Sequence, residues 1–267
     1  METPKLDRPV ITVKIGGKTA EDTDQLSAFA ADLQEVMADR YAVVVHGGGA
    51  EVSRISRRLG FEPRFHEGIR ITGREEMDVV EMILSGRVNK RLVRFFQSRG
   101  LPAVGLCGAD GAIFLGSTLG AVQGGETRTG NVSALNGRLL WALFQAGFLP
   151  VVSSTSMDEQ GSGVNINADS VALALACSLG SESLVFISDT AGVLKNGEVL
   201  RSLDRREVQR QIEAGVINGG MIPKATSAVQ ALERGVGQVI IGRYRGSGSL
   251  GSLLQGESGT RFHPGSE

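Results

Sequence analysis

VITVKIGG at residues 10–17 and YAVVVHGGG at residues 41–49 are the two stretches that decide the fold class of this chain. Each is a run of mostly β-branched apolar residues that ends in glycine, which is typical of a buried strand followed by a tight turn. Between them, residues 24–39 carry apolar side chains at helical spacing, and Asp22 or Thr23 is the candidate N-cap. Strand, helix and strand therefore follow one another from the start.

The same alternation continues to the end of the chain. Helices are predicted over residues 51–59, 74–98, 134–146, 168–179, 205–214 and 221–234, and strands over residues 102–106, 149–153, 183–188 and 238–241. The predicted fold class is α/β, with a three-layer α/β/α sandwich around a mostly parallel central sheet and two lobes. The polar stretch from Ser154 to Asp169 is the expected division between the lobes.

The helix predicted over residues 74–98 is apolar on more than one stripe. Thr72 and Glu75 have the spacing of a capping box, which predicts that the helix begins just after Thr72. A helix that is apolar on several faces is either buried centrally or packed against another subunit. The pattern alone leaves both placements open.

Composition excludes several classes of protein. The 267 residues carry 28 Lys and Arg against 29 Asp and Glu, a net charge of −1, which gives no electrostatic footprint for nucleic acid or an anionic membrane. Cys107 and Cys177 are far apart, so neither a disulfide scaffold nor a thiolate zinc site is expected. The start of the chain lacks the pattern of a signal peptide, and no apolar run approaches the ~18 residues of a membrane span. We therefore expect a cytoplasmic protein with no nucleic-acid or membrane partner.

Two glycine-rich turns follow predicted strands, at Gly16-Gly17 and Gly47–Gly49. Glycine there lets backbone N–H groups approach an anion, with the positive end of the next helix behind them. The alternative is a tight turn that needs a positive φ. A P-loop is excluded because Thr12 stands where its first glycine belongs, and a dinucleotide fingerprint is excluded by Val52.

Charged residues next to these turns are candidates for chemistry. Lys14 lies inside an apolar strand, so it is either paired with an anion or on an exposed edge. Lys224 and Asp169 lie near the starts of predicted helices, where each is also an ordinary surface or helix-start residue. Asp189 ends a strand and is otherwise a turn residue, and Arg70 either grips a carboxylate or faces solvent.

These residues occur in a set of ordered motifs that cover the chain from Val10 to about Arg261. The motifs are Val13-Lys14-Ile15-Gly16-Gly17, His46-Gly47-Gly48-Gly49, Gly68-x-Arg70-x-Thr72, Asn89-Lys90, Asn165-x-Asn167-Ala168-Asp169, Ser188-Asp189-x-x-Gly192, Gly219-Gly220-Met221-x-x-Lys224 and Gly259-Thr260-Arg261. Each motif alone is weak, but the ordered set is specific. Together they resemble the amino acid kinase superfamily and, within it, the N-acetylglutamate kinases.

The resemblance implies phosphorylation of the side-chain carboxylate of N-acetyl-L-glutamate by ATP with Mg²⁺, in arginine biosynthesis. It implies an N-terminal lobe, residues 1–165, that binds the acetylated amino acid and carries a dimerisation helix. It implies a C-terminal ATP-binding lobe over residues 166–267, and a homo-oligomer that we expect to be a dimer. No metal site built from protein side chains is expected.

The resemblance also implies residue roles. Lys14 and Lys224 would stabilise the transition state, and Asp169 would position both lysines. The implied substrate-binding residues are Gly48, Gly49, Arg70 and Asn165. The implied nucleotide-binding residues are Gly16, Gly17, Asp189, Thr190, Ala191, Gly192, Val193, Leu194, Val216, Ile217 and Asn218.

Departures from the pattern leave two alternatives. Gly73 stands where many relatives have an aspartate, and residues 127–132 are threonine-rich, as in kinases that act on carrier-linked aminoadipate or glutamate. Those relatives tend to carry N-x-D-G-D where this chain has NINAD at residues 165–169, which favours the free acetylated amino acid. A non-catalytic amino-acid sensor on the same fold is the other alternative, and the presence of both lysines argues against it.

Overall fold

The computed structural model describes residues 6–66, 69–122 and 125–265. The chain forms two compact units: unit 1 consists of Met1–Val43 and Leu175–Glu267, and unit 2 consists of Val44–Ala174. Their boundaries differ from those of the expected lobes because the first strand pairs with strands from the C-terminal third of the chain. None of the helices in the described residues is long and apolar enough to cross a membrane.

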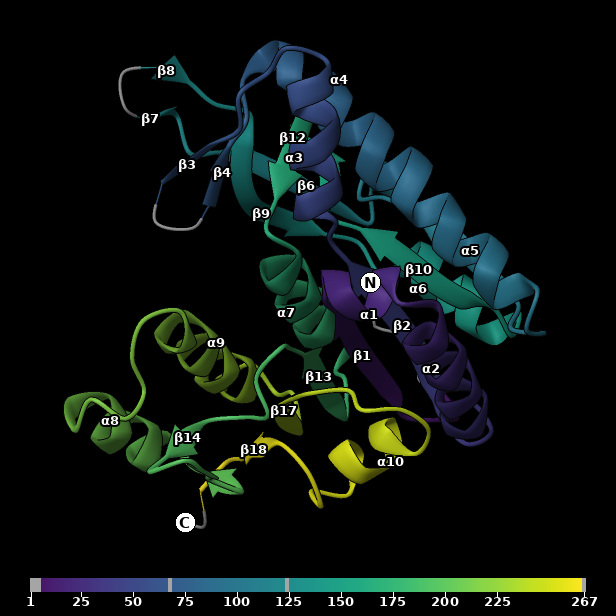
Figure 1. Cartoon of the computed structure of the whole chain (residues 1–267). Helices are drawn as coiled ribbons and strands as arrows, with labels where there is room; N and C mark the ends of the chain where they lie inside the picture. Colours follow the sequence, from purple (N-terminus) through teal and green to yellow (C-terminus); the bar gives the residue numbers. More distant parts are fainter. Residues whose placement is uncertain (1–5, 67–68, 123–124, 266–267) are drawn as a thin grey trace. The chain divides into compact units, whose positions relative to one another are not determined.

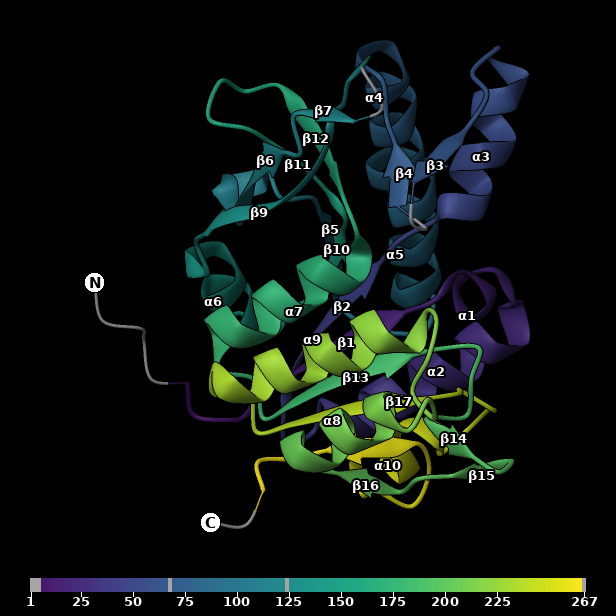
Figure 2. The same ribbon diagram turned by 90° about the vertical axis from the view of Figure 1, so that its left-hand side faces the viewer.

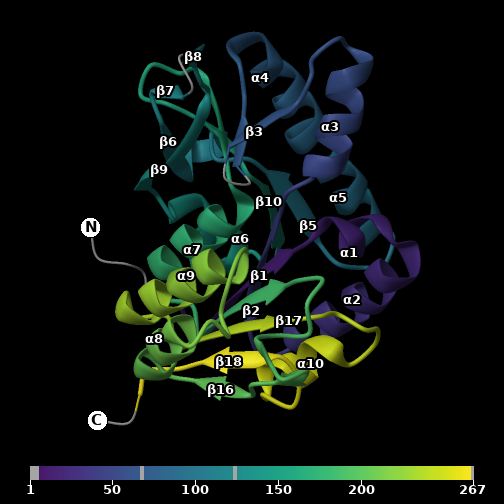
Figure 3. The same cartoon turned by 60° about the vertical axis from the view of Figure 1, so that its left-hand side comes forward.

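Unit 1 contains an α/β sandwich. Its strands are β1 (Val10–Ile15), β13 (Ser183–Ile187), β14 (Leu194–Lys195), β15 (Glu198–Val199), β16 (Ser202–Leu203), β17 (Gln238–Gly242) and β18 (Thr260–Phe262), and its helices are α1 (Gly17–Glu21), α2 (Thr23–Val36), α8 (Arg205–Glu213), α9 (Met221–Glu233) and α10 (Ser249–Leu254). The strand order is β16-β18-β17-β13-β1, with β13 parallel to both β1 and β17. Helices α8 and α9 lie on one face of these strands, and α2 and α10 lie on the other (Figures 1 and 3).

Local sequence signals explain how unit 1 begins. β1 is buried along nearly its whole length, because its residues are β-branched and apolar except for Thr12 and Lys14. The predicted N-cap at Asp22 is confirmed: its carboxylate accepts the backbone N–H groups of Asp24 and Gln25, both at 3.0 Å. Phe29 and Leu33 then place the apolar face of α2 in the core.

Unit 2 combines parallel strands with a smaller, mostly antiparallel sheet. Its strands are β3 (Arg64–His66), β4 (Ile69–Ile71), β5 (Ala103–Leu106), β6 (Phe114–Thr118), β7 (Ala121–Val122), β8 (Gly125–Glu126), β9 (Thr129–Leu135), β10 (Leu149–Ser153), β11 (Thr155–Met157) and β12 (Gly163–Ile166), and its helical segments are α3 (Gly49–Arg58), α4 (Arg74–Glu81), η1 (Met82–Val88), α5 (Asn89–Gln97), η2 (Asp110–Ala112) and α6 (Arg138–Gln145). The unit boundaries fall inside β2 (Tyr41–His46) and α7 (Ala168–Leu179). β10 pairs in parallel with β2 and β5, and the smaller sheet has the order β11-β12-β9-β6.

The long helix predicted over residues 74–98 is a rod made of α4, η1 and α5, which lies beside the smaller sheet (Figure 2). Its middle segment, η1, is a π-helix. The predicted capping box is wrong: the helix starts after Gly73, and no side chain caps it. Thr72 instead accepts a hydrogen bond from Asn165 Nδ2 on its hydroxyl at 2.9 Å. The threonine therefore serves tertiary structure and not the helix end.

The predicted fold class is confirmed. The molecule is a mixed α/β protein whose largest sheet is mostly parallel, and the two glycine-rich turns lie where the sequence placed them. β1 ends at Ile15 and α1 begins at Gly17, while β2 ends at His46 and α3 begins at Gly49. Both turns are thus strand-to-helix turns, the positions at which α/β folds bind ligands.

Candidate active site

A pocket of about 200 Å³ in unit 2 brings together all the residues predicted to bind the acetylated amino acid. Gly48 directly precedes α3, and Gly49 is its first residue. Arg70 lies in β4 and Asn165 in β12, so the pocket collects residues from positions far apart in sequence. Gly68, the glycine of the motif Gly68-x-Arg70-x-Thr72, lies outside the described residues.

Arg70 is built into the pocket wall and does not lie on the surface. Its side chain is 8% exposed and forms an ion pair with Glu76, whose Oε1 is 3.2 Å from Nη1. Nη2 donates to the carbonyl of Gly49 at 3.1 Å and to the Ser53 hydroxyl, and the guanidinium lies over the Phe65 ring. Burial lowers the pKa of Arg70 and the Glu76 carboxylate opposes that effect. The result is a fixed cation beside the glycine turn.

A hydrogen-bonded set of hydroxyl and amide groups supports Arg70 and Asn165. Thr129 Oγ1 donates to the carbonyl of Arg70 at 2.5 Å and accepts the N–H of Thr72 at 3.0 Å. Asn165 donates to the Thr72 hydroxyl, and the Asn165 N–H donates to the carbonyl of Arg128 at 2.8 Å. The polar wall of the pocket is therefore preorganised across three chain segments.

The remaining wall is apolar, and motif reasoning missed it. It is formed by Val52, Phe65, Ile69, Val80 and Leu84. Phe65 and Ile69 are 53% and 39% exposed, on the two strands of the β3–β4 ribbon. Their place in a short extended hairpin next to Arg70 is the sequence signal that could have identified them. One guanidinium, backbone N–H groups and an apolar wall suit a small carboxylate that also carries an apolar group.

Beneath the glycine turn lies His46, which is fully buried. Its Nδ1 is 2.8 Å from the carbonyl of Gly47, and its Nε2 is 3.0 Å from Asn89 Nδ2. Burial lowers the pKa of His46 from 6.5 to about 4, the Gly47 carbonyl opposes this, and the positive charges of Arg91 and Lys90 add to the lowering. The ring is therefore neutral at physiological pH.

Acidification is expected to destabilise the protein through His46. Between pH 6.5 and about 4 the unfolded chain binds a proton at this histidine that the folded chain does not, so stability falls as pH falls. The loss at the bottom of this window is about 3 kcal/mol. Urea unfolding of the wild type and of His46→Gln at pH 7 and at pH 4.5 measures it, and the variant should lose less. Equal losses in both proteins would assign the pH dependence to other groups.

In unit 1 the two predicted lysines come to the same end of the same pair of strands. Lys14 lies opposite Phe186 in the parallel register of β1 and β13, and its side chain is half-buried. Ser188 follows two residues later, and its hydroxyl accepts a hydrogen bond from Lys224 Nζ at 3.3 Å. At ~3.3 Å per strand residue, Ser188 lies about 7 Å beyond the level of Lys14. Because β1 lies between β13 and β2 in the sheet, Lys14 is not on an exposed edge. Lys224, early in α9, is held by Ser188 and is not a free surface lysine.

Three of the predicted nucleotide-binding residues, Gly16, Gly17 and Asp189, directly follow these strands or the residue after them. Gly16 lies so close to β13 that a Cβ there would be 3.3 Å from the Ile187 carbonyl oxygen, and Gly17 begins α1. Arg243 Nε donates to the Asp189 carbonyl at 2.8 Å, which fixes the start of the segment from Asp189 to Leu194. The loop from Val216 to Asn218 joins α8 to α9.

Gly192 has a φ of +144°, and a Cβ there would lie 2.6 Å from Thr260 Oγ1. That hydroxyl also accepts the N–H of Val193 at 2.8 Å, so the closing motif at Thr260 holds the predicted nucleotide segment in place. The glycine is thus required by both backbone conformation and space.

Gly192→Ala is expected to displace Thr260, to raise KM for ATP about tenfold and to lower stability by about 1–3 kcal/mol. ADP-release kinetics at varied ATP and urea unfolding measure the two effects. Gly251→Ala is the matched control, because a Cβ at Gly251 in α10 meets no atom within 4 Å. An unchanged KM for ATP would remove Gly192 from the nucleotide site.

Asp169 lies at the start of α7 in unit 2, where its N–H donates to Asn167 Oδ1 at 2.8 Å. The side chain of Asn167 thus serves the helix start, and the Asp169 carboxylate is not needed for capping. The role of the Asp169 carboxylate in positioning the two lysines remains a prediction from the family resemblance.

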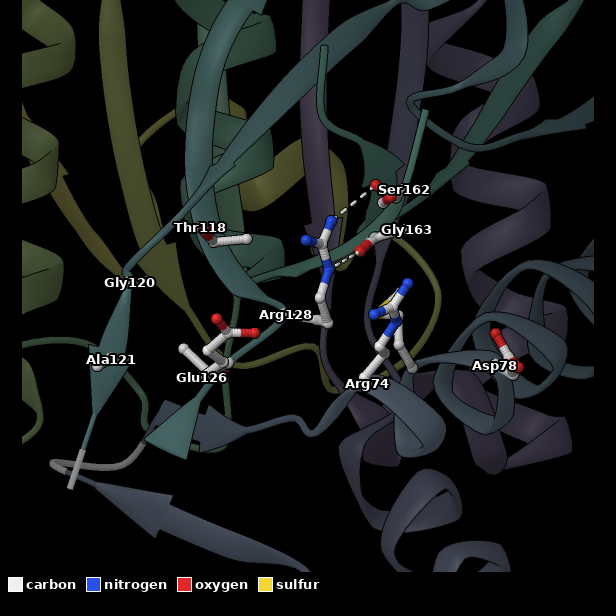
Figure 4. A pocket seen from close by; sticks show the side chains of 11 residues that line it. Arg74, Asp78, Thr118, Gly120, Ala121, Glu126, Arg128, Ser162 and Gly163 are labelled. Carbon is white, nitrogen blue, oxygen red and sulfur yellow. Dashed lines mark hydrogen bonds between the residues drawn. The ribbon is translucent and has the colours of Figure 1, made fainter. Parts of the chain in front are cut away.

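A larger pocket in unit 2, about 620 Å³, contains none of the predicted site residues (Figure 4). Arg74, Asp78, Glu126 and Arg128 bring charges of both signs to its lining. The guanidinium of Arg128 has a structural role in the pocket wall. It donates to the carbonyls of Gly163 and Ser162 at 2.7 and 2.9 Å and to the Asp158 carboxylate at 2.6 Å. The predicted substrate-binding residues line the smaller pocket and not this one.

The described residues include no cluster of three or more His, Cys, Asp or Glu side chains that could hold a metal ion. Mg²⁺ is usually bound by one or two carboxylates together with substrate phosphates, and it keeps several waters.

Comparison with known proteins gives consistent matches. Residues 9–243 match the amino acid kinase family. The chain is 41% identical over 231 residues to an acetylglutamate kinase of Nostoc punctiforme, covering 85% of this chain and 77% of that protein. It is 38% identical over 233 residues to an acetylglutamate kinase of Geobacillus kaustophilus, covering 86% and 88%. The solved structure of smu.665 from Streptococcus mutans is similar with a TM-score of 0.78 at 26% identity, covering 96% of this chain and 99% of that one.

Proposed function

Because the chain belongs to the amino acid kinase family, we propose that it transfers the γ-phosphoryl group of ATP to the side-chain carboxylate of N-acetyl-L-glutamate. The product is N-acetyl-L-glutamyl 5-phosphate, an intermediate of arginine biosynthesis. Relatives named acetylglutamate kinase, 38–41% identical over most of the chain, support this assignment. The observation that carries it is the pocket that joins Gly48, Gly49, Arg70 and Asn165.

The substrate explains why the site needs no catalytic base. A carboxylate with a pKa of about 4.3 is already ionised at neutral pH, so it can attack without losing a proton. The obstacle is the approach of two anions in line. Lys14, Lys224 and backbone N–H groups meet that obstacle by neutralising the transferring phosphoryl oxygens.

The two units bind different substrates. In unit 2, Arg70 and Asn165 hold the acetylated amino acid, and the N–H groups of Gly48 and Gly49 face its reacting end. In unit 1, Gly16, Gly17, the segment 189–194 and the loop 216–218 hold Mg²⁺·ATP. Asp169 positions the two lysines by its negative charge. Each role is supported by the position of the residue in one of the sequence motifs that resemble those of the family.

Assembly and location are part of the same proposal. The rod α4–η1–α5 joins two copies in a homodimer, and the enzyme acts in the cytoplasm. Met82 supports the first point, because it is a large apolar side chain on the rod and is 59% exposed. Light scattering of the purified protein tests the dimer.

A substrate panel tests the function. ADP release is measured with N-acetylglutamate, N-acetylaminoadipate, aspartate and glutamate, and the proposal expects turnover with N-acetylglutamate. Activity confined to the other three would contradict it. The carrier-linked alternative is supported by the threonine-rich segment 127–132, and turnover only with a purified carrier-linked substrate would favour it. Binding without ADP release would favour a sensor.

A further inference from the structure

The turn Gly47–Gly49 is held from below by the buried His46 and by the helical segment that runs through η1 into α5. A Cβ on Gly48 would lie 2.9 Å from Leu84 and 3.2 Å from Val88. The π-helical segment therefore presses two apolar side chains directly against the turn. Asn89, the next residue, contacts the histidine beneath it.

Asn89 connects three parallel strands through its side-chain nitrogen. Its Nδ2 lies 3.0 Å from His46 Nε2, 2.8 Å from the carbonyl of Val151 and 3.4 Å from the carbonyl of Leu106. These acceptors lie in β2, β10 and β5, respectively. Lys90 Nζ donates to Asn89 Oδ1 at 3.1 Å, which fixes the orientation of the carboxamide with its nitrogen toward the strands.

This contact decides the tautomer of His46. Asn89 Nδ2 can only donate, so His46 Nε2 must accept and the ring proton must be on Nδ1. Nδ1 then donates to the carbonyl of Gly47 at 2.8 Å. The ring is fully buried, so that carbonyl points into the protein.

The direction of the carbonyl fixes the direction of an N–H group. The Gly47–Gly48 peptide is trans, as are all described peptide bonds, and the C=O and N–H of a trans peptide point in opposite directions. The N–H of Gly48 therefore points away from the buried ring. Gly47, Gly48 and Gly49 all line the substrate pocket.

We propose that His46 and Asn89 are positioning residues that aim the Gly48 N–H at the substrate. Asn89 selects the Nδ1–H tautomer of His46, and His46 holds the Gly47 carbonyl so that the next N–H faces the pocket. Neither side chain touches the substrate. This inference rests on the proposed function, because it assigns the Gly48 N–H to the reacting end of the acetylated amino acid.

Two variants of one residue separate positioning from simple support. The amide of His46→Asn superposes on Nδ1 and keeps a donor for the Gly47 carbonyl, while that of His46→Gln reaches Nε2 and keeps an acceptor for Asn89. We expect His46→Gln to lower kcat/KM for N-acetylglutamate at least about tenfold, and His46→Asn to lower it less than about threefold. KM for ATP should change in neither, and both should lose stability to a similar extent.

Asn89→Ser is the second test, because a small polar residue leaves room for water to satisfy the strand carbonyls. It removes the tautomer selection, so kcat/KM should fall as in His46→Gln. Lys195→Met, at an exposed lysine of β14 outside this network, is the control and should stay near the wild-type value. Equal losses in His46→Asn and His46→Gln, or losses that follow the melting temperatures, would overturn the proposal.

Amide hydrogen exchange at Gly48 and Gly49 keeps this test independent of the function. Inactivity of the wild type with N-acetylglutamate would contradict the proposed function alone. Exchange should then still be faster in His46→Gln than in His46→Asn, because only the former frees the Gly47 carbonyl. Equal exchange in the two variants would overturn the positioning role whether or not the enzyme is active.

Discussion

Lys14→Met and Lys224→Met are each expected to lower kcat at least about a hundredfold while the fold stays intact. The reaction brings an anionic carboxylate to an anionic phosphoryl group, so its barrier depends on positive charge placed where negative charge accumulates. Lys14 is anchored in β1, and the Lys224 ammonium reaches Ser188 at the end of the neighbouring β13. Methionine keeps the length of the stem and removes only the charge.

Single-turnover kinetics and urea unfolding of both variants measure these effects. Lys195→Met is the matched control, because that lysine is exposed in β14. If the lysines act on the transition state, kcat falls and KM for N-acetylglutamate changes little. Near-normal turnover in both variants would refute their role, and a fall confined to one would leave a single lysine at the phosphoryl group.

Strand-to-helix alternation could be predicted from the sequence because the main strands are short apolar runs, and glycines follow β1 and β2 directly. The family motifs predicted that the glycine turn and Arg70 share a site. The buried ion pair of Arg70 with Glu76 could not be foreseen, because it depends on how β4 meets α4. An isolated arginine in a sequence is more often a surface residue.

Other features depend on tertiary contacts that periodicity does not report. Thr72 and Glu75 have capping-box spacing, but the hydrogen bond from Asn165 recruits Thr72 into the pocket wall. The π-helical segment shifts the phase of the rod in its middle, a change too local for a helical pattern to show. His46 directly precedes the glycine turn in the sequence, and only the position of Asn89 shows what holds its buried ring there.

Arg70→Met is expected to raise KM for N-acetylglutamate about a hundredfold, the scale of losing a buried charge that pairs with a ligand carboxylate. The guanidinium is preformed in the pocket, with Glu76, the Gly49 carbonyl and Ser53 holding it. Binding therefore costs little side-chain ordering. Arg70→Lys keeps the charge but loses the planar fork, so its KM should lie between that of the wild type and that of Arg70→Met.

The same substitution also affects stability, and a double variant separates the two effects. Glu76 is 6% exposed, so Arg70→Met leaves a buried carboxylate without its partner and should lower the free energy of unfolding by about 3–5 kcal/mol. Arg70→Met combined with Glu76→Gln removes that unpaired charge and should recover most of the stability. KM should nevertheless stay high, because the ligand carboxylate still lacks its cation. Recovery of KM together with stability would mean that Arg70 supports the pocket without binding the substrate, and acetylated-amino-acid recognition would have to be assigned to Asn165 and the glycine turn.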